Sequence, residues 1–133
     1  MANRMWQLKV QHLQKGLTIY SGKFRPNGAS AIATYKGKGY LPVRTGVGTI
    51  EIRLKKGDAA VASATAEKFT DSVKETVTLQ EGTFGTNIAI LESFDPATGI
   101  AVVKTATRAA PTVAADIASG ANNWIHFDFH LVN

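Results

Sequence analysis

The strongest constraint in this sequence is the alternation of apolar and polar side chains near its carboxyl end. Ile125, Phe127, Phe129 and Leu131 occupy every second position, and most residues between them are polar. Neighbouring side chains of a β-strand point to opposite faces of a sheet, so a period of two predicts a strand with one buried face. The run therefore predicts a strand in the centre of a sheet, with its aromatic face in the core.

The same period recurs along most of the chain. Residues 48–55 place Ile50, Ile52 and Leu54 on one face and polar side chains on the other. Residues 59–69 would tolerate a helix, but their β-branched residues favour a strand. Further strands are predicted at residues 1–14, 17–24, 30–36, 73–80, 87–94 and 100–108.

Turn residues separate these runs. Residues 95–99 read Asp-Pro-Ala-Thr-Gly, in which proline presets a type I turn and glycine accepts the left-handed conformation that closes a hairpin. Residues 109–123 are rich in alanine and weakly patterned, which predicts a long loop or a single helical turn around residues 112–118.

Together these signals predict an all-β fold. The chain of 133 residues suits a single domain, residues 1–133, built as a β-sandwich or jelly-roll-like fold of seven to nine short, mostly antiparallel strands. A small barrel is the other architecture compatible with this pattern. The sequence contains no cysteine, which excludes disulfides and thiolate chemistry. No run approaches the ~18 apolar residues of a membrane span, so no membrane partner is predicted.

The formal net charge of +5 is unevenly distributed. Residues 1–56 carry eleven lysines and arginines and one acid, a net charge of +10. Residues 57–133 carry four bases and nine acids, a net charge of −5. Such asymmetry indicates a charged partner or self-association rather than a particular fold.

Chemical motifs are sparse. His126, Asp128 and His130 would lie on one side of a strand, but the two histidines would be about 13 Å apart, too far to share one ion. We therefore expect a polar sheet face on which Asp128 pairs with its histidine neighbours, and no metal site. No spacing of nucleophile and base is visible, so the sequence predicts neither an enzyme nor a cofactor. The glycine-rich residues 35–40 and 45–48 are expected to form turns.

A nucleic-acid site is the main alternative. Lys36, Lys38 and Arg44 are interleaved with Tyr35 and Tyr40, a mixture of cationic and stacking groups that single-strand binders use. Only 8% of the residues are aromatic, and no RNA-binding signature is present. A solvated basic surface, or one that docks on an acidic protein, is therefore favoured over a nucleic-acid site.

Three blocks carry a resemblance to a known group of proteins. They are residues 45–52 (Thr-Gly-Val-Gly-Thr-Ile-Glu-Ile), residues 93–99 (Ser-Phe-Asp-Pro-Ala-Thr-Gly), and residues 123–126 (Asn-Trp-Ile-His) with the aromatic strand after them. Over residues 37–54 and 87–133 the chain resembles the small all-β virion proteins of tailed bacteriophages. Within that group it is most similar to capsid decoration, or cement, proteins.

The resemblance implies a homo-oligomer, a dimer or a trimer, that bridges subunits of the major capsid protein. Such a protein is made in the host cytoplasm and lies on the outside of the virion, where it stabilises the shell against the pressure of the packaged DNA. A phage tail or fibre component is a further alternative.

This interpretation assigns partner contacts to the basic half of the chain. Arg25, Lys36, Lys38 and Arg44 would supply charge complementarity, which mainly sets partner choice and association rate. The aromatic residues would supply buried anchors, although each of them also fits an ordinary core position. These candidate anchors are Trp6, Tyr20, Phe24 and Tyr40.

Overall fold

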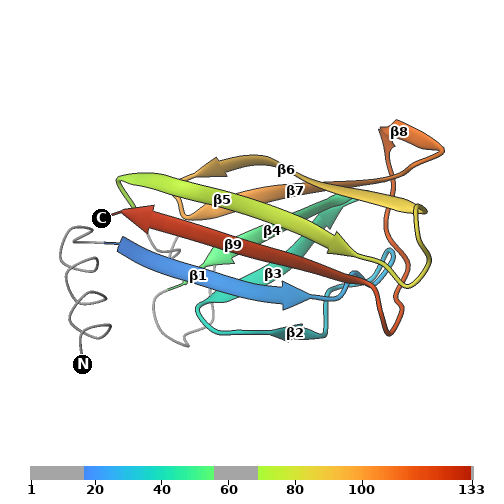
Figure 1. Ribbon diagram of the computed structural model, residues 1–133, viewed down its shortest axis with the longest axis horizontal. Helices are drawn as coiled ribbons and strands as arrows, with labels where there is room; N and C mark the ends of the chain where they lie inside the picture. The colour runs from blue at the N-terminus through green and yellow to red at the C-terminus, as the bar shows by residue number, and fades with distance from the viewer. Residues whose placement is uncertain (1–16, 56–68, 133) are drawn as a thin grey trace, which may run out of the picture.

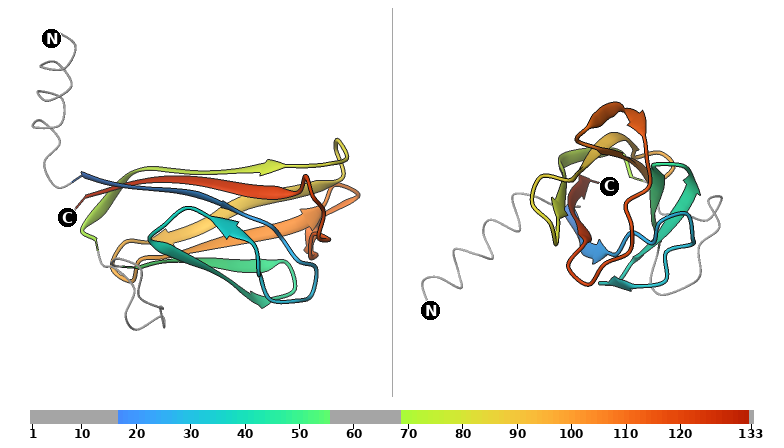
Figure 2. Two further views of the ribbon diagram at one scale, coloured as in Figure 1. Left: turned by 90° about the horizontal axis from the view of Figure 1, so that it is seen from below. Right: turned by 90° about the vertical axis from the view of Figure 1, so that its right-hand side faces the viewer.

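A computed structural model describes residues 17–55 and 69–132 of the chain, which form two antiparallel β-sheets (Figures 1 and 2). The first sheet has the strand order β2-β1-β9-β5. Its strands are β1 (Leu17–Phe24), β2 (Tyr35–Lys36), β5 (Asp71–Gln80) and β9 (Trp124–Val132).

The second sheet has the order β3-β4-β7-β6, and a short strand, β8, pairs with the end of β7. Its strands are β3 (Tyr40–Gly46), β4 (Thr49–Leu54), β6 (Asn87–Asp95), β7 (Ile100–Thr107) and β8 (Ala110–Ala114). The predicted all-β sandwich is confirmed, with nine strands in the described part of the chain. These residues include no helix, and therefore none that could cross a membrane.

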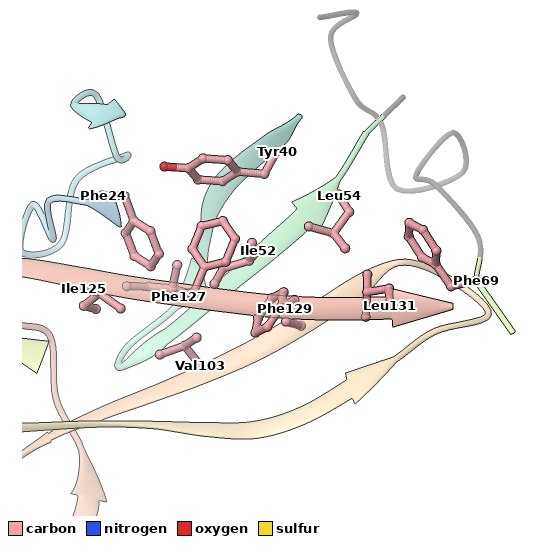
Figure 3. Close-up of a cluster of buried hydrophobic side chains, with 12 residues drawn as sticks. Phe24, Tyr40, Ile52, Leu54, Phe69, Val103, Ile125, Phe127, Phe129 and Leu131 are labelled. Carbon is pink, nitrogen blue, oxygen red and sulfur yellow. The ribbon is translucent and has the colours of Figure 1, made fainter. Parts of the chain in front are cut away.

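The core lies between the two sheets, where their apolar faces meet (Figure 3). Ile125, Phe127, Phe129 and Leu131 of β9 are buried, as the alternation predicts. The facing side chains of β4 are Ile50, Ile52 and Leu54, and they are also buried. Strand β9 lies between β1 and β5, which confirms its central position in the sheet.

Three segments differ from the sequence predictions. No strand was predicted over residues 40–46, and residues 45–48 were expected to form a turn, but Tyr40–Gly46 form β3. A strand was predicted over residues 30–36, but only Tyr35 and Lys36 pair, with the end of β1. A loop or helical turn was predicted over residues 109–123, but Ala110–Ala114 form β8. All three differences have the same cause: a strand forms where a neighbouring strand supplies hydrogen-bond partners, and local preferences do not specify that neighbour. The strand predicted at residues 1–14 and most of the one at residues 59–69 lie outside the described residues, and Phe69 itself lies outside the strands.

The predicted hairpin between β6 and β7 is confirmed. The Asp95 carbonyl accepts hydrogen bonds from the amides of Thr98 (3.3 Å) and Gly99 (2.9 Å). Gly99 has a φ of 69°, in the left-handed region that glycine adopts without strain.

Tyr40 connects the two sheets through the core. Its side chain extends from β3, is 1% exposed, and packs edge to face on Phe127 with ring centroids 4.6 Å apart. Its hydroxyl lies 2.8 Å from the Lys23 carbonyl oxygen and 2.7 Å from that of Lys36, so its one hydrogen is shared between β1 and β2. Burial raises the pKa of Tyr40, which keeps the hydroxyl protonated as a donor. A side chain at Gly22 would collide with the ring, which explains this glycine within β1.

We expect Tyr40→Phe to lower the free energy of unfolding by about 1–3 kcal/mol, because it leaves partly buried carbonyl groups without their donor. Urea denaturation measures the loss. Tyr35→Phe is the matched control, because Tyr35 is substantially exposed, and its effect should stay within about 0.5 kcal/mol. Equal effects of the two substitutions would contradict the role of the Tyr40 hydroxyl.

Asp116 joins the β3–β4 turn to the segment that follows β8. Arg44 donates to both carboxylate oxygens, from Nε at 3.0 Å and from Nη2 at 2.8 Å. The Gly48 amide donates to the same carboxylate at 3.0 Å. The Gly48 carbonyl in turn accepts from the Thr105 amide of β7. One carboxylate therefore holds this end of the second sheet together.

The stability that Asp116 contributes should be lost in acid. The hydrogen bonds from Arg44 hold the pKa of Asp116 below its usual value. A lowered folded-state pKa means that the unfolded chain binds more protons as the pH falls below about 4, so acid favours unfolding. We expect Asp116→Asn to be less stable than the wild type at neutral pH, with the difference shrinking below about pH 4. Urea denaturation over a pH series checks this, and a constant difference would contradict it.

Candidate functional site

A row of cationic and titratable side chains crosses three strands on the outer face of the first sheet. Lys36 of β2 pairs directly with Lys23 of β1. Lys23 pairs on its other side with His126 of β9. Paired residues of antiparallel strands place their side chains on the same face, about 4.5–5.5 Å apart at Cβ. The register therefore aligns two lysines and a histidine side by side.

Two cationic side chains lie against the ring of Trp124, at the end of this row. The Lys23 Nζ lies 4.4 Å from the centroid of the Trp124 ring, and the Arg25 guanidinium carbon lies 4.6 Å from it. Arg25 also donates from Nη2 to the Ala121 carbonyl at 3.3 Å. The negative face of an indole ring attracts cations, so the ring stabilises both of them in close proximity.

We call this group the basic corner: Lys23, Arg25, Lys36, Trp124 and His126. It lies where the end of β1, β2 and the start of β9 meet (Figure 1). A shallow depression beside it is lined by Lys23, Lys36 and His126, among others.

The described residues place no carboxylate within ion-pair distance of these cations. Asp128 follows on the same face of β9, but it already has other partners. It accepts a hydrogen bond from Ser21 Oγ at 2.8 Å and lies 3.4 Å from Lys74 Nζ and 3.2 Å from His130 Nε2. The charge of the basic corner is therefore not neutralised by this carboxylate.

The corner carries an electrostatic cost. Like charges directly opposite each other across two strands destabilise a sheet. His126, which donates from Nε2 to Gln80 Oε1 at 2.9 Å, has a pKa lowered first by burial and then by the charge of Lys23. A bound anionic group would relieve both the lysine repulsion and this suppression of the histidine's protonation. The arrangement is suited chemically to binding an anion.

The structure places the predicted partner-contact residues unevenly. Arg25 and Lys36 belong to the basic corner, and Lys38 is exposed in the turn that follows β2. Tyr20 is half-buried and packs edge to face on Phe69, with ring centroids 5.7 Å apart.

The contact prediction is wrong for Phe24 and Tyr40, whose side chains are buried in the core and present no surface to a partner. Core packing, the alternative reading of these aromatic residues, is correct for both. Arg44 is held by its two hydrogen bonds to Asp116. Trp6 lies outside the described residues.

Three members of the corner, Lys23, Trp124 and His126, were not predicted as partner contacts. Lys23 counted only toward the net charge, Trp124 belonged only to the block of residues 123–126, and His126 was assigned to a polar sheet face. The signal that places them together is the pairing of β1 with β2 and β9, which sequence periodicity does not specify.

The predicted pairing of Asp128 with its histidine neighbours is confirmed for His130 and wrong for His126. His130 and Asp128 pair at 3.2 Å, whereas His126 turns to Gln80. Within the ranges 17–55 and 69–132, no three side chains of the metal-binding types form a cluster that could hold an ion.

Comparison with known proteins adds no relative: no family model, no curated protein and no solved structure matches this chain. The fold and the site therefore define the protein as an all-β sandwich that carries a basic corner. The similarity to phage decoration proteins stays a prediction.

The repulsion within the corner predicts a stabilising substitution. Lys36→Glu places a carboxylate opposite Lys23, and an opposite-charge pair across two strands contributes about 0.2–1 kcal/mol. We expect a gain in the free energy of unfolding of up to about 1 kcal/mol, smaller in high salt because the ions screen the pair. The free energy of unfolding of Lys36→Gln should lie between those of the wild type and of Lys36→Glu. Urea denaturation in low and high salt measures the effect, and a destabilised Lys36→Glu variant would contradict it.

Proposed function

We propose that this chain is a non-catalytic structural protein that attaches through its basic corner to an acidic protein surface. The observation that carries the proposal is the Lys36–Lys23–His126 row, in which strand pairing aligns two lysine charges beside a histidine and no described carboxylate neutralises the lysines. Electrostatic repulsion of this kind is retained in proteins at sites where a bound partner offsets it.

An acidic protein surface is favoured over a single-stranded nucleic acid because the corner offers no free stacking platform. Single-strand binders stack bases on exposed aromatic rings. Tyr40 is 1% exposed, and Trp124 is 7% exposed with two cations beside its ring. Tyr35 is 39% exposed, but it pairs with Phe24 and so lies on the opposite face of β2 from Lys36. Binding to single-stranded DNA that weakens steeply with salt would favour the nucleic-acid alternative instead.

The particular acidic surface in this proposal is the major capsid protein on the outside of a tailed-phage head. Its support is the resemblance of residues 37–54 and 87–133 to capsid decoration proteins. Attachment of this kind needs no catalytic group: several weak contacts become strong when an oligomer binds a symmetric shell. A tail or fibre component would use the same physics and would differ in its position on the particle.

Heating phage particles with and without the protein tests the function. Heads that carry the protein should retain their DNA to a higher temperature, because bridged capsid subunits separate less readily. If heads that lack it release DNA at the same temperature and salt concentration, the proposal is wrong.

A charge-reversal variant tests the role of the basic corner in the same particles. Lys36→Glu should weaken rebinding to stripped heads by at least about tenfold, because it brings a like charge to an acidic surface. Arg108→Glu, an equal change at an exposed residue that follows β7 of the other sheet, should rebind like the wild type. Equal rebinding of both variants would contradict attachment through the corner.

A further inference from the structure

The loop between β5 and β6 exposes an aromatic side chain completely. Phe84 is 100% exposed, whereas the other phenylalanines of the described segments pack in or against the core. A fully exposed phenylalanine is costly in water, and rigid aromatic side chains are frequent anchors of protein interfaces. Phe84 therefore has the properties of an interface residue.

Hydrogen bonds hold this loop in shape. The Glu81 carboxylate accepts from the Gly85 amide at 3.0 Å and from the Asn87 amide. Thr86 Oγ1 donates to the Thr83 carbonyl at 3.2 Å. The Gly82 amide donates to the Asn123 side chain at 2.9 Å. Because the loop is ordered before any contact forms, Phe84 would bind with little loss of conformational freedom.

A groove on the outer face of the second sheet has the matching chemistry. It measures about 330 Å³ and lies between β6, the end of β7 and β8. Its apolar lining comes from Ile88, Ile90, Ala106, Pro111 and Ala114. An apolar cavity of about 150 Å³ already accepts benzene, so this groove has room for a phenyl ring.

The exposed apolar and charged side chains around the groove also resemble those of a protein interface. Ile90 is 56% exposed in the isolated chain. Glu92 and Lys104 also line the groove, and they form a loose ion pair at 3.9 Å. An apolar centre with a charged margin is the usual composition of a protein-protein contact.

We propose that Phe84 of one copy of this protein inserts into the groove of a second copy, and that the second copy returns the same contact. The loop and β8 lie at the same end of the sandwich (Figure 1), and the groove begins at Ile88, soon after Phe84. Phe84 is fully exposed, so it does not fill the groove of its own chain. A two-fold axis lets both copies use both features and closes the assembly as a dimer.

The second copy is the favoured occupant because this chain carries both complementary parts, an exposed anchor and an apolar groove. This inference does not depend on the capsid or on the basic corner, which lies on the outer face of the other sheet. A purified chain is sufficient to test it.

Sedimentation equilibrium of four samples, the wild type, two variants and their mixture, tests the proposal. The wild type should form dimers. Phe84→Ala removes the anchor and Ile90→Asp makes the groove polar; each should weaken dimerisation by about thirtyfold or more. A mixture of the two variants should associate more strongly than either variant alone, because Phe84 of the Ile90→Asp chain can enter the intact groove of the Phe84→Ala chain.

Controls keep each outcome decisive. Val47→Ala removes an apolar side chain that is 59% exposed in the β3–β4 turn and should dimerise like the wild type. Circular dichroism confirms that each variant is folded. A monomeric wild type overturns the proposal. An unaffected Ile90→Asp variant, or a mixture that associates no better than its components, also overturns it. Assemblies larger than dimers would contradict the two-fold arrangement.

Discussion

Hydrogen bonding by the Tyr40 hydroxyl is the interaction on which both the sandwich and its basic corner depend. The Tyr40 side chain extends from β3 through the core, and its hydroxyl lies within hydrogen-bond distance of the carbonyl oxygens of Lys23 and Lys36. Strand β2 contains only two residues, so its pairing with β1 alone is weak. The tyrosine holds the backbones of both lysines from inside, and strand pairing then directs their side chains to the same outer face. Core packing thus stabilises an arrangement that charge repulsion alone would disfavour.

The elements that could be predicted from the sequence are those with a strong local signal. The alternation of β4 and β9 identifies their buried faces, and the Asp-Pro-Ala-Thr-Gly segment identifies a hairpin. The short strands β2 and β8 have no such local signal. They form because a neighbouring strand supplies hydrogen-bond partners. The basic corner depends on register: shifting β1 by one residue against β9 would turn Lys23 away from His126. Periodicity reports which face a residue occupies and not which strand lies beside it.

The uneven charge of the sequence has a different meaning once the chain is folded. Arg44, from the basic half, is neutralised by Asp116, 72 positions away in the acidic half. Arg53 pairs with Glu51 on the same strand. These contacts remove cations from any partner surface. The basic corner keeps its charge because strand pairing surrounds Lys23 with Lys36 and His126 instead of acids. The number of charges along the sequence therefore indicates a charged partner but does not locate its binding site.

The two proposed contact surfaces differ in physical character and in position. Charge at the basic corner would accelerate encounter with an acidic surface, whereas insertion of Phe84 would lengthen the lifetime of a dimer. The corner lies on the outer face of the first sheet and the groove on that of the second, with the core between them. Dimerisation through the second sheet would leave both corners accessible. Each dimer would then bind a repeating surface through two sites, and the second attachment would be intramolecular. Modest affinity at each corner would be sufficient for durable binding to a particle.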